Sequence, residues 1–487
     1  MKKSLLYTVS LIPVFAGTVM AQNGDVIVNI TEPVSDYNVV QPGETTSGKI
    51  TVNVNGSDSD SPYTISGSLN LNAGGDVYTD NWDGANVIDK TADAITLNVN
   101  SGTIQTKIFG QTVVGTNVYG NVVMNINGGV LGKGTQTTAD CNILGGLGQY
   151  AVTDPMVVIY GDNTLNIGSN DSGASQPTIY GYITTQQGAI IKGDTHLNIM
   201  GGHITYEENT YSNVYAGPNY GGTVEGNVYV NITGGTIDRN VHGGGVAGDT
   251  AGKILGSTNI TISGGSILGD VYGGYSGEGG SANGTNITLI GDGSNINIAG
   301  VISGGNRGTS DCSLLGTKTL YIGNSSQAFV AAEGQAFEIQ DLNVVVITKD
   351  SKVAFSNDFS INKLVVELNE TALLADGQAQ LTMTQGSKFD TLTLISSSDF
   401  SAGDPNYLDL NSVFGDNTSV VLASMKENNT ALTVVDSSNQ EWSTTDLNYG
   451  EDGSISFNLG TQIPESSTCA AIFGLFVIAF AIYRKRK

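Results

Sequence analysis

The feature that most constrains the fold is an eight-residue phrase that recurs between Gly193 and Asn306. Its three clear copies, LNIMGGHI (197–204), VNITGGTI (230–237) and ITISGGSI (260–267), alternate apolar and polar residues and then reach a Gly-Gly pair. Each is followed by a shorter phrase: NVYAG (213–217), NVHGG (240–244) or DVYGG (270–274), with a weaker VISGG at 301–305. Alternation of period two predicts short strands with one buried face, and glycine permits sharp corners. Self-similarity at a fixed period indicates stacked repeats, so each unit is predicted to form one coil of a β-solenoid.

Apolar–polar–apolar triplets extend the repeat in both directions. They begin at residues 52, 69, 97, 124, 165, 197, 230, 260 and 287, with a faint triplet at 320. This spacing predicts about 30 residues per coil. One longer interval predicts a loop between Leu131 and Pro155, where the strand pattern is lost.

The middle residue of the triplet is asparagine in seven of these units: Asn53, Asn70, Asn98, Asn125, Asn166, Asn198 and Asn231. In a parallel, in-register stack, asparagine amides can hydrogen-bond to one another along the column. The alternative is that each asparagine is only a polar, outward-facing residue that favours turns. Under either interpretation the column has a structural role.

Composition supports this fold class. Only 13% of the 487 residues are charged and 66 are glycine, which suits a solenoid better than an ordinary globule. We predict an all-β chain with a parallel β-helix over residues 96–325, preceded by an N-terminal cap and first coils over 22–95. Strand patterns continue over 326–460 while glycine becomes rarer, which predicts a less regular C-terminal β region. Residues 461–487 are predicted to carry a single C-terminal hydrophobic helix.

The N-terminus has the pattern of a secretory signal peptide. Lys2 and Lys3 are followed by an apolar run and then by Val19-Met20-Ala21. This order predicts a signal over residues 1–21 that is cleaved between Ala21 and Gln22. The body of the chain is therefore expected to act outside the cytoplasm.

The exported body is strongly acidic. The whole chain has a net charge of −25, and residues 22–463 hold 14 basic and 44 acidic residues, a net charge of −30. Such a surface repels nucleic acid and anionic lipid, so neither is an expected partner. Calcium and cationic polymers are compatible with the charge.

The C-terminus combines an apolar segment with a basic end. Cys469–Tyr483 is apolar or small throughout, and the basic residues Arg484, Lys485, Arg486 and Lys487 follow. The segment is shorter than the ~20 residues that a spanning helix usually needs. The basic end is expected to stay on the cytoplasmic side. By itself this pattern predicts a marginal membrane anchor or a retention signal.

The same tail resembles the PEP-CTERM sorting signal. The matching residues are Pro464, Glu465, Ser467 and Thr468, the helix 470–482, and the basic cluster 484–487, whereas Ser466 stands where the family has a second proline. The resemblance covers only about the last 25 residues of the chain. It implies processing by an exosortase-like membrane enzyme and delivery to the surface or extracellular matrix of a Gram-negative bacterium. A plain tail anchor is the alternative, and a sortase-type signal fits less well because IPESS lacks Thr-Gly.

The repeats resemble the glycine-rich β-solenoid repeats of adhesin-like bacterial surface proteins. The pattern GG-x-I followed by V-x-GG carries the resemblance, and it supports the fold more than any function.

Three aromatic residues follow the valine of the second phrase: Tyr215, His242 and Tyr272, with Phe109 further towards the N-terminus. If the valines point inward, these rings point outward and stack on successive coils. Flat rings pack against sugar rings, so the column is a candidate glycan-binding platform. The alternative is a stabilising ladder of neighbouring aromatic residues.

No metal or cofactor site is expected. Gly-Asp steps recur at Gly161-Asp162, Gly193-Asp194, Gly248-Asp249, Gly269-Asp270 and Gly291-Asp292. Carboxylates at corners are possible calcium ligands, but the GGxGxDxUx pattern is absent and turn-forming aspartate is the simpler interpretation. His196, His203 and His242 stand singly, and we expect exposed positions rather than metal ligation.

Catalysis is an alternative interpretation, because some enzymes with a parallel β-helix cleave polysaccharides. Asp238 and Asp270 follow corresponding phrases, and Arg239 and Arg307 are the arginines of the body, but they form no recognisable constellation. The sequence therefore predicts an exported structural or adhesin-like surface protein, with partners limited to the processing enzyme, extracellular glycan or further copies of itself. A carbohydrate-active β-helix enzyme and a purely structural layer protein are the alternatives.

Overall fold

The computed structural model describes residues 8–10, 25–35, 37–40, 48–58, 64–77, 92–111, 115–133, 143–144, 156–171, 173–206, 212–219, 221–246, 252–308, 311–369, 379–402 and 405–463. The chain is mostly β, and its sheets are built largely from parallel strands, which confirms the all-β prediction. It divides into two compact units: unit 1 is Met1–Ile287 with Asn295–Lys318, and unit 2 is Thr288–Ser294 with Thr319–Lys487. Within the described ranges, no helix is both long and apolar enough to cross a membrane.

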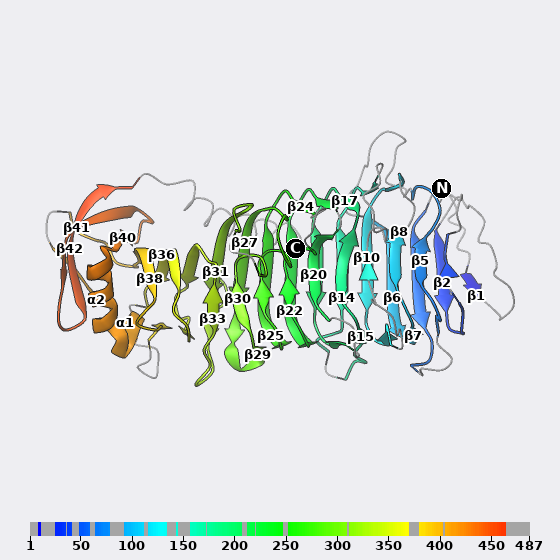
Figure 1. The fold of residues 1–487 in the computed structure, drawn as a ribbon, viewed down its shortest axis with the longest axis horizontal. Coiled ribbons are helices and arrows are strands. Elements are labelled where there is room, and N and C mark those ends of the chain that lie inside the picture. Colours follow the sequence, from blue (N-terminus) through cyan, green and yellow to red (C-terminus); the bar gives the residue numbers. More distant parts are fainter. Residues whose placement is uncertain are drawn as a thin grey trace. The chain divides into compact units, whose positions relative to one another are not determined.

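The main sheet of unit 1 contains most of the triplets. Its strands pair in parallel and in register from one repeat to the next (Figure 1). In chain order they are β1 (Thr8–Ser10), β2 (Val26–Ile30), β4 (Ile50–Asn55), β6 (Asp93–Ser101), β10 (Asn121–Ile126), β14 (Asn163–Ile167), β18 (Thr195–Ile199), β22 (Val228–Ile237), β25 (Thr258–Ile267) and β27 (Ala282–Leu289), of which the last runs into unit 2.

Shorter strands that follow the main strands along the chain extend this sheet: β7 (Thr103–Ile104), β11 (Val130–Leu131), β15 (Thr178–Tyr180), β19 (His203–Thr205) and β29 (Ile296–Ile298). Strands β22 and β25 run through both parts. β22 pairs with β18 before its Gly-Gly pair and with β19 after it.

Three further parallel sheets complete the repeats, and the second and third of them serve different repeats. One precedes the main sheet along the chain and contains β9 (Asn117–Val118), β13 (Val157–Ile159), β17 (Ala189–Ile191), β21 (Thr223–Val224) and β24 (Lys253–Ile254). The second follows it in the later repeats, with β16 (Ile183–Gln187), β20 (Val214–Asn219), β23 (Val241–His242), β26 (Val271–Tyr272) and β30 (Val301–Ser303). The third holds the early counterparts, β3 (Tyr37–Asn38), β5 (Leu69–Asn72), β8 (Ile108–Gln111) and β12 (Ile143–Leu144).

The core of unit 1 is formed by the first and third residues of the triplets. Leu197 and Ile199 are 0% exposed, and the corresponding Val230 and Ile232 are 0% and 1% exposed. Burying one such side chain contributes about 1.5–3 kcal/mol. Because each repeat adds the same apolar set in the same register, the core is continuous along the stack.

The two kinds of Gly-Gly pair serve different purposes. In the first phrase, Gly235 and Gly265 have φ angles of +82° and +95°, a conformation that turns the chain and that side chains resist. In the second phrase, Gly243 and Gly273 do not have left-handed φ angles. Instead, a Cβ atom at Gly273 would lie 2.8 Å from the Cβ of Thr285. The chain also bends at the second pair, as expected, but there glycine provides space rather than a left-handed backbone angle.

Unit 2 continues with parallel strands and then changes pattern. β34 (Val344–Ile347), β36 (Ser360–Glu367), β38 (Lys388–Ile395) and β40 (Ala431–Val435) pair in parallel, whereas β41 (Glu441–Tyr449) and β42 (Ser454–Gln462) add antiparallel pairings that also involve β39 (Asn406–Asp409). The smaller elements are β28 (Gly291–Asp292), η1 (Gly293–Asn295), β31 (Leu315–Ile322), β32 (Phe329–Val330), β33 (Glu338–Gln340), β35 (Val353–Ala354) and β37 (Leu381–Thr382).

Unit 2 also contains helices that the sequence analysis did not predict. They are α1 (Asn411–Phe414), η2 (Gly415–Asn417) and α2 (Thr418–Asn428). Helix α2 buries Thr418, Val421, Leu422 and Met425, which are spaced i, i+3, i+4 and i+7. It ends at Asn429 in the left-handed conformation. The spacing and the Asn429 cap are the signals that identify this helix within the predicted β region of residues 326–460.

Candidate functional site: the outward face of the main sheet

A ladder of asparagine side chains follows the outward face of the main sheet. Six consecutive bonds, each donated by Nδ2 of one repeat to Oδ1 of the repeat before it, measure 2.7–2.9 Å. They join Asn29, Asn53, Asn98, Asn125, Asn166, Asn198 and Asn231. The ladder predicted from the sequence is therefore confirmed for six of its seven members.

Asn70 is the exception, and Asn29 takes its place. Asn70 lies on β5, in a different sheet, and donates to Oδ1 of Asn38 at 2.5 Å. Asn29 comes from VIVNI, a triplet that the sequence analysis overlooked. The ladder residues Asn53 and Asn98 are consequently 45 positions apart, and Asn29 and Asn53 are 24 apart. The repeat length varies more than the triplet spacings predicted, because two early triplets belong to one repeat.

A second column consists of polar side chains in the turns before successive main-sheet strands. The Asp162 Oδ1 accepts the backbone N–H of Asp194 at 2.8 Å, and the Asp194 Oδ1 accepts that of Asn227 at 2.7 Å. A Cβ atom at Gly193 would overlap the Asp162 Oδ1. Glycine therefore precedes the acidic residue in these repeats to make room for the carboxylate of the repeat before.

These hydrogen bonds explain most of the Gly-Asp steps without a metal ion. The Asp270 Oδ1 accepts the N–H of Val301 at 2.9 Å in an equivalent turn. In unit 2, Asp292 accepts the N–H of Ser294 at 2.9 Å, and the hydrogen bonds from Ser294 lower the pKa of Asp292. Asp249 lies outside the described residues. Among the described residues, no group of three or more His, Cys, Asp or Glu side chains is arranged to hold a metal ion.

Between the two columns lies an outward pair of rings. His196 and Tyr229 occupy the same position on β18 and β22, and their rings stack with centroids 5.1 Å apart and an interplanar angle of 9°. Burial, followed by the charge of Asp194, raises the pKa of Tyr229. The outward face of these repeats therefore carries a turn Asp or Asn, an aromatic ring and a ladder Asn side by side. These are Asp194, His196 and Asn198 in one repeat and Asn227, Tyr229 and Asn231 in the next.

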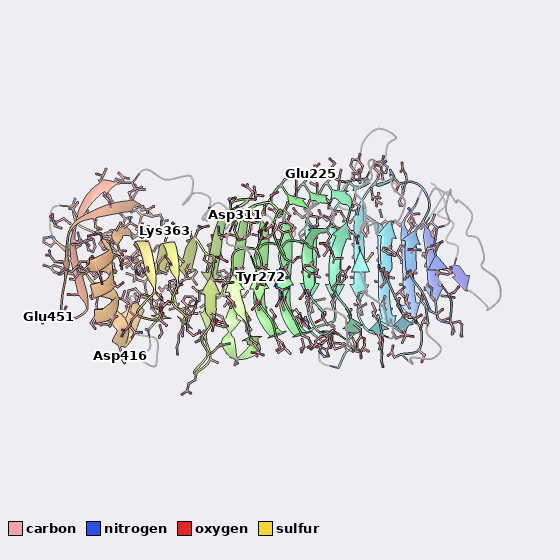
Figure 2. The ribbon with its side chains drawn as sticks, viewed as in Figure 1. Glu225, Tyr272, Asp311, Lys363, Asp416 and Glu451 are labelled. Atoms are coloured by element: carbon pink, nitrogen blue, oxygen red, sulfur yellow. The ribbon has the colours of Figure 1, made fainter. Side chains whose placement is uncertain are left out.

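The aromatic column proposed as a glycan platform is not outward. Tyr215, His242 and Tyr272 are only 8%, 0% and 6% exposed (Tyr272 is labelled in Figure 2). Their rings do stack on successive repeats, at 5.0 Å between Tyr215 and His242 and 4.9 Å between His242 and Tyr272. The expected outward orientation is wrong, and the alternative, a stabilising ladder, describes the geometry.

The reason for the error is that both faces of this sheet are buried. β16 and β20, of five and six residues, are buried at every position, and so are the two-residue strands β23 and β26. Alternation between two faces predicts an outward side chain only where one face of the sheet is uncovered. Phe109, the fourth member of the proposed column, lies on β8 in another sheet, opposite Asn70.

His242 is also the exception to the expectation of exposed histidines. The ring is fully buried, and neither ring nitrogen makes a hydrogen bond of normal geometry. Burial and the charge of Arg307 lower the pKa of His242 to about 3, against a weak opposing effect of the Tyr275 backbone. The imidazole is therefore neutral at physiological pH and acts as a flat apolar ring between two tyrosines.

The carboxylates considered for catalysis have separate structural partners. Asp238 lies 2.8 Å from Nε2 of His203 and accepts the Thr205 hydroxyl at 2.6 Å. Asp270 accepts the hydroxyl of Tyr272 at 2.9 Å. Nearby, the guanidinium of Arg239 lies 4.8 Å from the ring centroid of Tyr206.

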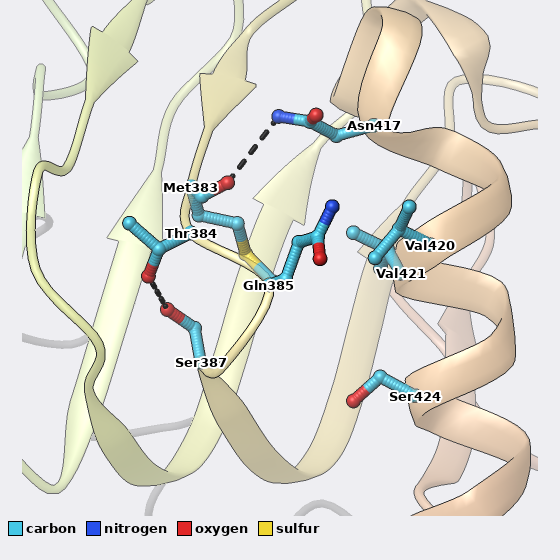
Figure 3. A pocket seen from close by; sticks show the side chains of 8 residues that line it. All are labelled: Met383, Thr384, Gln385, Ser387, Asn417, Val420, Val421 and Ser424. Atoms are coloured by element: carbon cyan, nitrogen blue, oxygen red, sulfur yellow. Dashed lines mark hydrogen bonds between the residues drawn. The ribbon is translucent and has the colours of Figure 1, made fainter.

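Two pockets in the described part of unit 2 are candidate binding sites. The first, of about 10 Å³, lies between the β37–β38 connection and α2, and Figure 3 shows Met383 and Asn417 joined across it by a hydrogen bond of 3.2 Å. It holds at most one water molecule. The second, of about 290 Å³, is a wide depression next to Gln340, Asp341 and Asp358. The Asp358 carboxylate in it accepts a hydrogen bond from Thr384.

Several predicted site residues lie outside the described residues. They are the cleavage position, Ala21 and Gln22, and the sorting signal, Pro464, Glu465, Ser467, Thr468, Arg484, Lys485, Arg486 and Lys487, together with the expected C-terminal helix. These expectations stay predictions.

Comparison with known proteins gives no further assignment. No family model, no curated protein and no solved structure matches this chain. The candidate site therefore depends on the geometry alone: a regular outward face of amides, carboxylates and rings on a parallel sheet.

Proposed function

We propose that this chain is an exported structural or adhesin-like protein of the bacterial surface or extracellular matrix. In this proposal unit 1 is a parallel β-helix of about 30 residues per coil, and the C-terminal tail sorts the protein. The observation that carries the proposal is the asparagine ladder, which repeats one polar face over seven strands. A face of this kind suits display and stiffness.

The β-helix part of the proposal is supported by the order of the strands. In the later repeats the chain visits the same three sheets in the same order, as in β21, β22 and β23 followed by β24, β25 and β26. Each strand pairs in parallel with its counterpart in the next repeat. Cross-core hydrogen bonds support closure, since the hydroxyl of Thr258 donates to the Gly273 carbonyl at 2.7 Å.

The sorting part of the proposal is supported by the sequence of the two ends. A signal over residues 1–21 directs export, and the PEP-CTERM-like tail from Pro464 holds the chain for an exosortase-like enzyme. Intact mass and fractionation of the protein from its native host test this. A mass that begins at Gln22 and ends near Pro464, in the surface or matrix fraction, supports it. A mass that retains residues 484–487 in the membrane fraction indicates a permanent anchor instead.

The adhesive part of the proposal requires side chains that contact a ligand. On the outward face of the main sheet we assign this role to His196 and Tyr229. We expect the exported protein to bind matrix polysaccharide prepared from its host and His196→Ser/Tyr229→Ser to lose at least half of this binding. Tyr407→Ser is the matched control, because Tyr407 is 70% exposed in unit 2. Equal binding by all three proteins contradicts adhesion through this face. Depolymerisation of the polysaccharide by the wild type favours the enzyme alternative.

A further inference from the structure

The first strand of the mature chain is left with an uncovered edge. In the full-length chain, β2 is covered by β1, which pairs with it in parallel through Thr8↔Ile27, Val9↔Val28 and Ser10↔Asn29. Strand β1 lies within residues 1–21, the predicted signal peptide. This inference rests on the proposed export, because cleavage after Ala21 removes β1 and leaves β2 at the end of the main sheet.

The exposed edge carries both apolar and hydrogen-bonding groups. Val26, Val28 and Ile30 are 7%, 2% and 3% exposed while β1 is present. The N–H of Val26 donates to the carbonyl of Lys49, on the side of β4. Because backbone groups alternate sides along a strand, those of Ile27 and Asn29 point to the opposite, outer edge. Such an edge attracts another strand unless something covers it.

Nothing among the described residues of the N-terminal repeats replaces β1 as a cover. The sequence analysis predicted a cap within residues 22–95, but the described part of that range contains the strands β2 to β5 and the start of β6 and no helix. A repeat stack normally needs a polar cap at each end. β1 is therefore the cover of β2 in the full-length chain, and the predicted cleavage would remove it.

The five residues of β2 are complementary to themselves. In an antiparallel pair with a two-fold axis at Val28, Val26 faces Ile30 of the second copy and Ile27 faces Asn29 of the second copy. Buried residues then meet buried residues and outward residues meet outward residues. The outer-edge groups of Ile27 and Asn29 form the hydrogen-bonded pairs. A two-fold contact of this kind closes on itself and does not grow into a filament.

We propose that removal of residues 1–21 exposes the edge of β2, and that two copies of the mature chain pair through this edge as an antiparallel, two-fold dimer. Asp25 and Glu32 flank the strand, and the axis brings Asp25 near Glu32 of the second copy. These like charges weaken the dimer at low ionic strength, so salt strengthens it.

The first experiment measures the molar mass of the exported protein by light scattering after size-exclusion chromatography. The mature chain is expected at twice its monomer mass, and the chain purified with residues 1–21 attached is expected as a monomer. Ile27→Pro removes an edge N–H that the β2–β4 pairing does not use, so it is expected to give a folded monomer. Ile27→Thr keeps that N–H and is the matched control, expected to remain a dimer.

A second experiment tests the register in which β2 of one copy pairs with β2 of the other. In a background with Cys141, Cys312 and Cys469 replaced by serine, Ile27→Cys/Asn29→Cys is expected to form disulfide-linked dimers on oxidation. Hydrogen-bonded antiparallel pairs have Cα atoms ~5.5 Å apart, within the range that a disulfide spans. Ile27→Cys alone places no thiol opposite its partner and is expected to stay uncrosslinked.

Three results overturn the inference: a monomeric mature chain at all salt concentrations, a dimeric Ile27→Pro variant, or open-ended oligomers. The same sample separates this failure from that of the proposed function. A surface protein that retains residues 1–21 by intact mass contradicts cleavage and export as proposed. A cleaved but monomeric protein contradicts only the dimer.

Discussion

Unit 1 contains two columns of stacked side chains that look alike in the sequence and differ in the structure. The asparagine ladder lies on the outward face of strands of five or more residues, and its members are half-buried. The Tyr215–His242–Tyr272 column lies at strands of which two contain only two residues, and it is buried. The comparison teaches that alternation predicts an outward side chain only where one face of the sheet is uncovered, since β20 has six residues and all of them are buried.

The largest expected effect is the pH dependence of the unfolding free energy that the buried His242 causes. The pKa of His242 is lowered to about 3 in the folded chain, from 6.5. As the pH falls, the imidazole of His242 is therefore protonated in the unfolded state before it is protonated in the folded state. Stability from this group is complete above pH 6.5 and is lost progressively towards pH 3. At ~1.4 kcal/mol per pH unit the loss approaches 5 kcal/mol. Denaturant unfolding of His242→Phe is expected to lack this component, and equal pH slopes for both proteins contradict the assignment.

The second effect concerns the space that glycine provides at Gly273, directly after Tyr272 of the buried column. A methyl group at Gly273 meets Thr285, so Gly273→Ala is expected to lower the free energy of unfolding by ~1–3 kcal/mol through overpacking. Gly308→Ala is the control, because Gly308 has open space around it and differs only in a φ of +74°. Its expected loss is ~1 kcal/mol. A tolerated Gly273→Ala together with a damaging Gly308→Ala would mean that backbone angle matters more than space.

The third effect tests the outward ladder. Asn166→Ala breaks two amide bonds, to Asn125 and Asn198, and is expected to lower the free energy of unfolding by ~1–2 kcal/mol. Asn29→Ala breaks one bond among the described residues and is expected to have about half that effect. Thr164→Ala changes the same face of the same strand outside the ladder and serves as the control. If all three variants unfold at the same denaturant concentration, the ladder contributes nothing measurable.

The smallest effect concerns the exposed contact beside the two columns. The side chain of His203 is 46% exposed and pairs with Asp238 at 2.8 Å. Exposed ion pairs contribute ~0–1 kcal/mol because water and salt screen them. His203→Ala is therefore expected to change the unfolding free energy by less than ~0.5 kcal/mol. A larger loss would show that this contact organises the turn after β19.

Much of unit 1 could be predicted from periodicity. The triplets at 97, 124, 165, 197, 230 and 260 all lie on parallel main-sheet strands, and their apolar residues form the core. The predicted strands of unit 2 around residues 344–347 and 391–395 are also present. The triplet at 69 was assigned to the wrong sheet, because a triplet identifies a strand and not the neighbour with which it pairs.

The candidate site was less predictable. The sequence marked the asparagines, but it did not reveal that Asp162 and Asp194 bond to the next repeat or that His196 stacks on Tyr229. Those contacts join residues 32 or 33 positions apart, and they exist only once the register is fixed. The signal that could have found them is the glycine that comes directly before each turn aspartate or asparagine.

The sequence by itself determined the repeat, the buried positions of the main-sheet strands and six of the seven ladder asparagines, since each depends on a local pattern that recurs along the chain. Only the tertiary structure decided which rings are buried, which glycines provide space, and that β1 pairs with the edge of β2. Burial and edge pairing depend on neighbours contributed by other repeats. A local pattern therefore predicts that a strand exists, and the assembled sheets determine what covers it.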